Sequence, residues 1–232
     1  MKFNQRSLEK ELLDGSNIPF KEIALNMQEL NTINRILGGH QITITGFKHI
    51  LRNRKTISVC EIGSGGGDNL VAIVKWCAMH GIQVNCIGID MNEACIAFAK
   101  KNPTLLNNTA FICSNYSTVV FEKKPDILFS SLFCHHFSDK DLQYQLNWMQ
   151  KNSTMGCFIN DLHRHWLAYF SIKYLAQIFS KSYLLKNDAP LSVARGFTKR
   201  EWVKLFKIVG ITNYTIQWKW AFRHLIIFKN PL

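Results

Sequence analysis

The sequence predicts an α/β fold with a doubly wound, mostly parallel sheet of seven strands. Apolar segments that read as strands alternate with helical segments in the order βαβαβ, which gives a parallel sheet covered by helices on both faces. Two β-rich stretches close the chain and form a hairpin. The 232 residues, 47% of them hydrophobic, supply enough material for one such core.

Each element is predicted by its own local pattern. The strands are expected at 57–62, 86–90, 110–113, 125–131, 157–161, 214–220 and 222–228. Helices are expected at 92–101, 139–151 and 198–209; in the last, Thr198 is the cap and Glu201 stands three positions later. An aromatic-rich helical segment is expected at 163–187.

The segment before the first strand reads as a helical extension. Residues 6–54 are expected to be helical, since the apolar residues of 22–37 fall on one helix stripe and Gly38-Gly39 ends it. No repeat or flexible linker divides the chain. We therefore predict an N-terminal helical cap over 1–54 and a main domain over 55–232.

A glycine-rich turn after the first strand indicates a cofactor site. The strand at 57–62 breaks into Gly63, Gly65 and Gly67, where the backbone can approach a ligand closely. About twenty residues later the next strand ends in Asp90, the position of the acid that binds ribose hydroxyls in dinucleotide folds. Asp68 stands where the dinucleotide fingerprint has its third glycine, which makes NAD the weaker interpretation.

The acid Glu61, at the end of the first strand, favours a cationic amino-acid ligand over a pyrophosphate. The pattern Glu61-x-Gly63-x-Gly65-x-Gly67, with Asp90 downstream, resembles motifs I and II of the class I S-adenosylmethionine-dependent methyltransferases, over about residues 55–230. The resemblance implies the Rossmann-like methyltransferase fold with S-adenosylmethionine as cofactor. The cofactor residues that it implies are Glu61, Gly63, Ser64, Gly65, Gly67, Asp90, Met91, Asn115, Tyr116 and His135; Asn115 replaces the acid that often receives the adenine amine.

Four of the eight histidines follow two neighbouring strands. The segment 132–137, with His135-His136, resembles the small-molecule methyltransferases of the ubiquinone-biosynthesis type. Histidine is suited to take the proton that a hydroxyl loses as it attacks a methyl group. The predicted catalytic residues are His136, His165 and Asp161. The alternative is that these histidines cap strand ends and bond backbone carbonyls.

The segment 163–195 corresponds to a substrate-covering insertion in the resembling family. Its aromatic residues suit a flat or lipophilic acceptor, although the same stripe can pack the insertion onto the sheet. The predicted substrate-binding residues are His163, Trp166, Tyr169, Phe170 and Arg195. Arg195 is predicted to clamp an anionic substrate or, alternatively, to form a surface salt bridge.

Composition limits the other functions. The net charge of +12 permits nucleic-acid binding, but the cations are spread along the chain, so a nucleic-acid partner is not expected. Seven cysteines without a Cys-x-x-Cys pair read as reduced core thiols, and no metal site is predicted. The chain shows no secretory signal and no apolar run that spans a membrane, which predicts a cytoplasmic protein with a small-molecule substrate.

These observations predict methyl transfer from S-adenosylmethionine to a hydroxyl of a small aromatic or polyketide-derived metabolite. The segment 29–39, with 161–165, resembles a bacterial subgroup of methyltransferases associated with polyketide-type and phenolic products. Methylation of RNA or protein is the first alternative and is favoured only by the charge. A non-catalytic cofactor-binding protein is the second.

Overall fold

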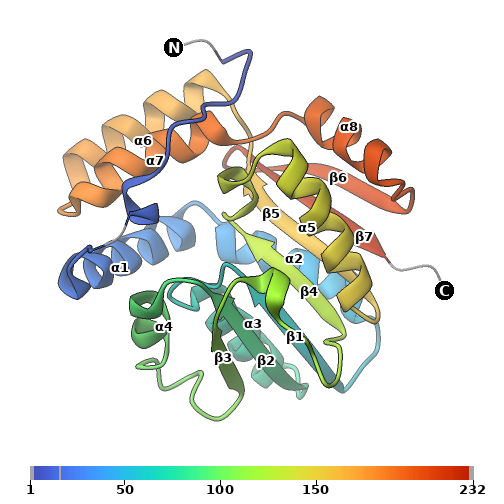
Figure 1. Cartoon of the computed structure of the whole chain (residues 1–232). Helices are drawn as coiled ribbons and strands as arrows, with labels where there is room; N and C mark the ends of the chain where they lie inside the picture. Colours follow the sequence, from blue (N-terminus) through green and yellow to red (C-terminus); the bar gives the residue numbers. More distant parts are fainter. Residues whose placement is uncertain (1–2, 16, 230–232) are drawn as a thin grey trace.

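A seven-stranded sheet runs through the molecule in the order β3-β2-β1-β4-β5-β7-β6 (Figure 1). The computed structural model describes residues 3–15 and 17–229. Strands β1 to β5 are parallel, whereas β7 is antiparallel to both of its neighbours, β5 and β6. The strands are β1 Thr56–Ile62, β2 Gln83–Asp90, β3 Thr109–Cys113, β4 Ile127–Ser131, β5 Gly156–Leu162, β6 Tyr214–Lys219 and β7 Arg223–Lys229. The predicted fold class and the closing hairpin are confirmed.

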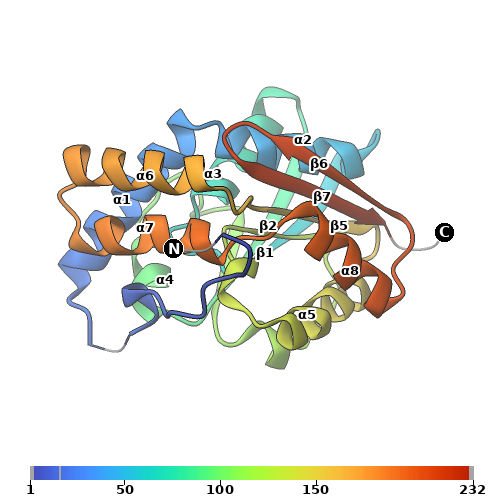
Figure 2. The ribbon, with the colours of Figure 1, turned by 90° about the horizontal axis from the view of Figure 1, so that it is seen from above.

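Helices cover both faces of the sheet (Figure 2). One face packs against α2 and α3 through residues such as Phe47 and Leu70, and the other against α5 and α8 through residues such as Leu146 and Trp202. The α-helices are α1 Phe20–Ile36, α2 Gly39–Leu51, α3 Asp68–Met79, α4 Glu93–Ala99, α5 Asp139–Asn152, α6 Trp166–Phe179, α7 Tyr183–Arg195 and α8 Lys199–Val209. Three short 3-10 helices complete the order: η1 Leu12–Asp14, η2 Tyr116–Thr118 and η3 Cys134–His136.

The N-terminal region differs from the prediction in two respects. Residues 6–15 and 17–19 are not a continuous helix: they have no helical structure apart from η1, and α1 begins after Pro19. Helix α2 belongs to the sheet core, because Phe47 and Ile50 are packed in one cluster with Ile57 of β1. The predicted division at residue 54 therefore falls inside one packed core.

A helical layer lies above the carboxyl ends of the parallel strands (Figure 1). Helices α6 and α7, which follow β5 as the predicted insertion, pack against each other, and α1 contacts α7. Helix α8 begins at the predicted cap: Thr198 and Glu201 form a reciprocal capping box. No helix within residues 3–15 and 17–229 is long and apolar enough to cross a membrane.

Candidate active site

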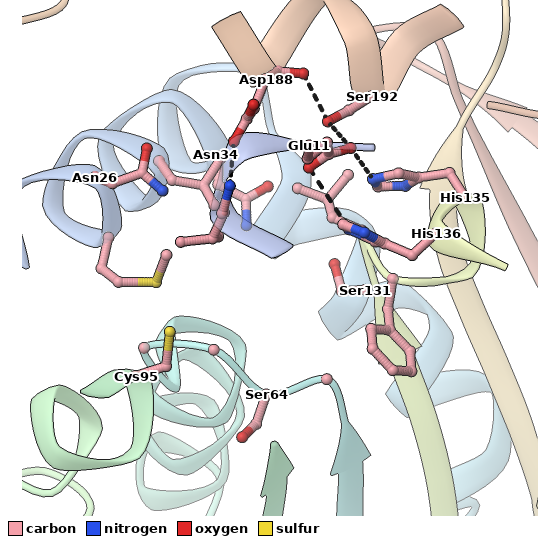
Figure 3. A pocket seen from close by; sticks show the side chains of 18 of the residues that line it. Glu11, Asn26, Asn34, Ser64, Cys95, Ser131, His135, His136, Asp188 and Ser192 are labelled. Atoms are coloured by element: carbon pink, nitrogen blue, oxygen red, sulfur yellow. Dashed lines mark hydrogen bonds and ion pairs between the residues drawn. The ribbon is translucent and has the colours of Figure 1, made fainter. Parts of the chain in front are cut away.

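A cavity of about 2090 Å³ opens between the carboxyl ends of the strands and the helical layer (Figure 3). Its floor is the glycine loop after β1, and its far wall is made by α1, α7 and the N-terminal segment around η1. Ligands of open α/β sheets bind at this edge. Because sites for one small ligand usually measure about 300 to 1,000 Å³, the cavity has room for a cofactor and an acceptor together.

The glycine loop has the conformation that only glycine adopts without strain. Gly63, Gly65 and Gly67 have φ angles of 67°, 49° and 75°, in the left-handed region. The phenyl ring of Phe133 lies where a Cβ on Gly63 would stand, whereas a Cβ on Gly65 would have only the Sδ atom of Met27 nearby, at 3.7 Å. Gly63 and Gly65 line the cavity; Gly67 caps α3 and does not.

Asp90 joins the end of β2 to this loop. Its Oδ2 accepts a hydrogen bond from the backbone N–H of Gly65 at 2.8 Å, and its Oδ1 accepts one from Asn92 at 2.8 Å. Burial raises the pKa of Asp90, while these backbone hydrogen bonds act in the opposite direction. The carboxylate lines the cavity at the predicted ribose position.

Two buried oxygens beneath the loop have no partner in the described part of the chain. Glu61 is 1% exposed; its Oε1 accepts a hydrogen bond from Asn69, whereas its Oε2 and the Oγ of Ser64 are unpaired. Burial, reinforced by the charge of Asp68, raises the pKa of Glu61 well above its usual range. Buried polar atoms are normally satisfied, so these two fit the ammonium end of an amino-acid ligand such as the methionine part of S-adenosylmethionine.

The remaining predicted cofactor residues border the same cavity. Tyr116 is buried, and Met91 stands at the rim with 71% of its surface exposed. Asn115 also lines the cavity, but its Oδ1 already accepts from the N–H and the hydroxyl of Ser117, at 3.0 Å each. That oxygen holds the turn at η2 and is not free for the adenine amine as the resemblance implied.

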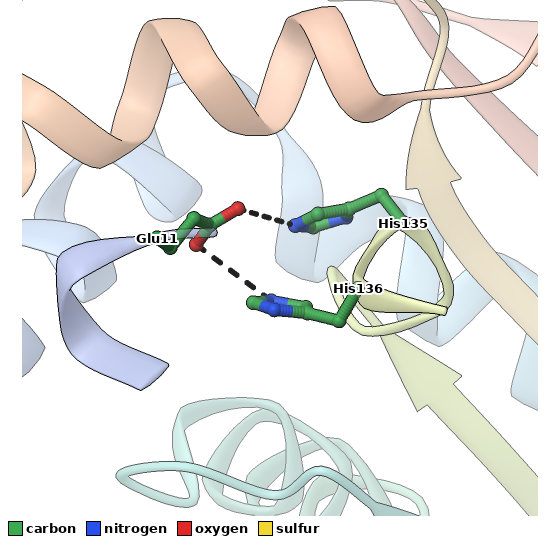
Figure 4. A group of neighbouring side chains, drawn as sticks. All are labelled: Glu11, His135 and His136. Carbon is green, nitrogen blue, oxygen red and sulfur yellow. Dashed lines mark ion pairs between the residues drawn. The ribbon is translucent and has the colours of Figure 1, made fainter. Parts of the chain in front are cut away.

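A cluster of histidines and carboxylates forms the opposite wall (Figure 4). His135 Nδ1 lies 2.7 Å from Asp161 Oδ1, and its Nε2 lies 3.4 Å from Glu11 Oε1. His136 Nδ1 lies 3.2 Å from Asp14 Oδ1, and its Nε2 lies 3.7 Å from Glu11 Oε2. Both rings therefore meet a carboxylate at each nitrogen.

The charged groups in this cluster shift one another's pKa values. Burial alone would lower the pKa of His135, but the carboxylates of Asp161 and Glu11 outweigh it and raise the pKa to about 9. Burial would raise the pKa values of Asp161 and Glu11, yet their contacts with His135 hold both below the usual range. Without another cation, His135 and its two carboxylates are charged at neutral pH.

Two arginines hold the turn that carries the histidines. Arg195 donates hydrogen bonds to the carbonyl oxygens of His135, His136 and Glu9, at 3.1, 2.8 and 2.7 Å. Arg6 donates to the carbonyls of His135, Phe137 and Arg195. Arg195 lines the cavity, but its guanidinium is engaged with the backbone, so it does not have the predicted role of an anion clamp.

Several predicted site residues do not line the cavity. Asp161 is completely buried behind His135, and His165 caps α6 by accepting from the N–H of Leu167 and stacks on Phe222. His163 accepts a hydrogen bond from the indole of Trp218 on β6. Of the predicted catalytic residues, His136 lines the cavity, whereas His165 caps the start of α6 and accepts from a backbone N–H, which differs from the alternative of a strand-end cap bonded to a carbonyl.

The aromatic residues of α6 face away from the cavity, contrary to the prediction. Trp166 and Phe170 are 55% and 40% exposed, and Tyr169 packs edge-on against Phe3. The helix presents its smaller side chains instead: Ala168, Ser171, Ile172 and Leu175 line the cavity. A stripe of aromatic residues predicts an apolar helix face, but it does not predict whether that face lines the cavity, packs on another helix or is exposed.

The acids of the N-terminal segment were not predicted as site residues from the sequence. Glu11 is 7% exposed and receives a hydrogen bond from Ser192 of α7 at 2.7 Å. In the sequence, Glu11 and Asp14 look like ordinary solvated charges at the start of a helix. No local pattern could have placed them beside histidines that follow β4.

Comparisons with known proteins agree with this site. A methyltransferase domain family profile matches residues 53–210. Among solved structures, the plantazolicin methyltransferase BpumL, in complex with SAH, superimposes with a TM-score of 0.66 at 18% identity, over 91% of this chain and 89% of that one. Human N-acetylserotonin methyltransferase, in complex with SAM, gives 0.67 at 12% identity, over 92% and 57%. Magnesium protoporphyrin IX methyltransferase from Synechocystis, with bound SAH, gives 0.55 at 11% identity, over 94% and 90%. No curated protein sequence matches the chain.

The chain belongs to the methyltransferase domain family, because the matched region is well over half of its length. The solved methyltransferases share the fold of this chain. The class I S-adenosylmethionine-dependent methyltransferase predicted from the glycine motif is thereby confirmed, together with the cofactor of that class.

Proposed function

We propose that the protein transfers the methyl group of S-adenosylmethionine to a hydroxyl oxygen of a small aromatic or polyketide-derived metabolite. One observation carries the proposal: the glycine loop and the histidine cluster face each other across a single cavity (Figure 3). The first wall offers the unpaired oxygens of Glu61 and Ser64 to a cofactor. The second offers imidazole and carboxylate groups to an acceptor that must lose a proton.

The cofactor wall has the parts that the predicted cofactor needs. Bound S-adenosylmethionine supplies a methyl group on a positively charged sulfur. Glu61 and the loop of Gly63 and Gly65 would hold the amino-acid end, and Asp90 would accept hydrogen bonds from the ribose hydroxyls. The phenyl ring of Phe133, which lies beside Gly63, also lines the cavity and would contribute an apolar surface next to the bound cofactor.

The acceptor wall supports attack by a hydroxyl. As the acceptor's oxygen forms its bond to the methyl carbon, the carbon–sulfur electron pair stays with sulfur and the hydroxyl proton passes to the protein. His136 is our proposed proton acceptor, because it lines the cavity and is the more exposed of the two histidines, at 21% of its side chain. Asp161 does not contact the acceptor; its role is to orient His135.

The lining supports a lipophilic acceptor. Apolar side chains from four elements border the acceptor half of the cavity, among them Leu13, Ile33, Ile172, Leu185 and Val193. Apolar walls with a few convergent polar groups are typical of sites for small, largely apolar ligands. Methyl transfer itself needs mainly alignment and exclusion of water, which such a lining provides.

Calorimetry with S-adenosylhomocysteine tests the cofactor half first. We expect micromolar binding by the wild type, loss of binding by Asp90→Ala, and unchanged binding by Glu122→Ala, which removes an exposed acid before β4. A wild type that does not bind would overturn the proposal.

An acceptor screen then tests the second half. Phenols and hydroxylated polyketide fragments are incubated with labelled cofactor, and the methylated atom is identified by mass spectrometry and NMR. Transfer to an oxygen supports the proposal. Cofactor binding without transfer to any acceptor would favour the non-catalytic alternative.

A further inference from the structure

The cluster of Glu11, His135 and His136 has hydrogen-bonding requirements that neutral side chains cannot meet. Each imidazole has a carboxylate oxygen near both of its nitrogens: Asp161 and Glu11 for His135, Asp14 and Glu11 for His136. A neutral imidazole carries a hydrogen on one nitrogen only. If each Nδ1–H donates to its outer carboxylate, each Nε2 needs either a second proton or a metal ion to meet the oxygens of Glu11.

We propose that Glu11, His135 and His136 bind a divalent transition-metal ion, and that this ion receives the acceptor's oxygen. One imidazole nitrogen of His135, one of His136 and an oxygen of Glu11 lie within 4.8 Å of one another (Figure 4). Ligands that are 2.0–2.1 Å from one tetrahedral ion stand about 3.3 Å apart. Glu11 Oε1 lies 3.4 Å from His135 Nε2, and Glu11 Oε2 lies 3.7 Å from His136 Nε2. Binding to one ion would therefore bring the three ligand atoms closer together by about 1.5 Å at most.

The surroundings of the three ligands support the assignment. Metal-binding histidines commonly donate their other N–H to a carboxylate, and Asp161 and Asp14 occupy that position for His135 and His136. The third ligand, Glu11, accepts a hydrogen bond from Ser192. All three ligands thus have an outer partner that fixes their orientation. Two positive groups lie close by: Arg195 Nη1 is 3.8 Å from Asp14 and donates to the carbonyl of Glu9, and Arg6 donates to the carbonyl of His135.

The ligand set indicates which ions fit. Two imidazoles and one carboxylate suit Zn²⁺ or Fe²⁺, whereas Mg²⁺ prefers an all-oxygen set. Three protein ligands leave a coordination position open, and all three residues line the cavity, so that position can face the acceptor. This extends the proposed function: an ion there would lower the pKa of a hydroxyl that binds to it, so that the hydroxyl would give its proton to water before methyl transfer, and His136 would act as a ligand in place of a base.

Metal binding is tested without turnover. The full-length protein, stripped with a chelator, is titrated with Zn²⁺ against a chromogenic competitor, with Co²⁺ as a spectroscopic probe and Mg²⁺ for comparison. We expect one equivalent of Zn²⁺ and a visible Co²⁺ spectrum. Glu11→Gln and His136→Gln should each weaken Zn²⁺ binding by more than about 100-fold, and Asp14→Asn by about 10- to 100-fold.

The controls separate ligand loss from misfolding. His49→Gln removes an exposed histidine of α2 and should leave Zn²⁺ binding unchanged. Circular dichroism checks that each variant is folded, and the half-exposed Asp14 gives a variant that does not disturb the core. The inference would be overturned if the wild type bound neither Zn²⁺ nor Co²⁺. It would also be overturned if Glu11→Gln, His136→Gln and Asp14→Asn bound Zn²⁺ as tightly as the wild type.

The inference rests on the proposed function only for the role of the ion, and the two can fail separately. S-adenosylhomocysteine binding to the metal-free protein, with no Zn²⁺ uptake, would remove the metal site and leave the methyltransferase proposal standing. Zn²⁺ uptake that depends on Glu11, without methyl transfer to any acceptor, would confirm the site and overturn its role in transfer.

Discussion

Asp161 and His135 form a hydrogen-bonded pair of 2.7 Å at the centre of the acceptor wall, and both side chains are almost completely buried. The pair joins the end of β5 to the turn after β4. Because its Nδ1 is held by Asp161, the ring of His135 has one orientation, with Nε2 directed at Glu11. The geometry of the whole cluster therefore depends on a residue that does not itself reach the cavity.

Asp161→Asn should lower methyl transfer without lowering cofactor affinity. The amide keeps the size of the side chain but removes the charge that orients the imidazole, so we expect kcat to fall by about 10- to 100-fold. The dissociation constant of S-adenosylhomocysteine should stay within about twofold, since Asp161 does not line the cavity. A folded variant with unchanged kcat would show that Asp161 serves the fold alone.

Gly63→Ala should destabilise the protein more than Gly65→Ala. Both positions have positive φ, which costs a residue with a Cβ about 1–2 kcal/mol. At Gly63 the new Cβ would also collide with the ring of Phe133, whereas at Gly65 it would make only an ordinary van der Waals contact with the Sδ atom of Met27. We expect the two losses, measured by urea unfolding, to differ by about 1–3 kcal/mol. Equal losses would show that Phe133 moves aside freely.

Glu61→Gln should gain stability relative to the wild type as the pH rises. The pKa of Glu61 in the folded protein is raised by burial, so folding is penalised progressively above the unfolded value of about 4.5. The amide does not titrate. Unfolding free energies measured from pH 5 to 8 should therefore shift in favour of the variant.

Glu61→Gln should also weaken the binding of the cofactor. We propose that the negative charge of Glu61 binds the ammonium group of S-adenosylmethionine. An amide has no charge, so the affinity for S-adenosylhomocysteine should fall tenfold or more. Opposite movements of stability and affinity are the expected signature; a variant that loses both would indicate a fold defect.

Below neutral pH, His224 should reduce stability. It is 2% exposed on β7, its Nδ1 has no partner among the described residues, and its ring lies 4.7 Å from that of His163. Burial, with the charge of His163, lowers the pKa of His224 to about 4. The unfolded chain therefore takes up the proton first, and stability falls as the pH drops from about 6.5 to 4, by up to about 3 kcal/mol.

Urea unfolding at a series of pH values checks this prediction. His224→Gln should flatten the profile between pH 6.5 and 4, while His49→Gln, on the exposed side of α2, should keep it. A profile that stays steep in His224→Gln would assign the acid sensitivity to another group.

The fold was predictable because its signals are local. Each strand is a short apolar run bounded by turns or polar residues, and the strand–helix alternation then selects a parallel sheet. The cofactor loop was predictable for the same reason: Glu61, Gly63 and Gly65 are neighbours in the sequence, and Asp90 follows at the end of the adjacent strand.

The acceptor wall was only partly predictable because it is assembled from distant segments. His135 and His136 carry a signal as a pair after a strand, but Glu11 lies in a stretch that was predicted to be helical and is not. The interpretation of α6 was wrong for a related reason: its aromatic residues predict an apolar face, yet the packing of α6 on α7 turns Trp166 and Phe170 outward.

Arg6 and Arg195 fix the turn after β4 through its backbone, which makes the turn suitable for engineering. Both guanidinium groups bind main-chain carbonyl oxygens, which every amino acid carries, so these contacts do not require a histidine at position 136. Position 135 is different, because the ring of His135 is buried against Asp161. Replacing the side chain of His136 should change the chemistry of the cavity wall while the scaffold stays in place. Position 136 is therefore a natural starting point for a library of variants aimed at new acceptors.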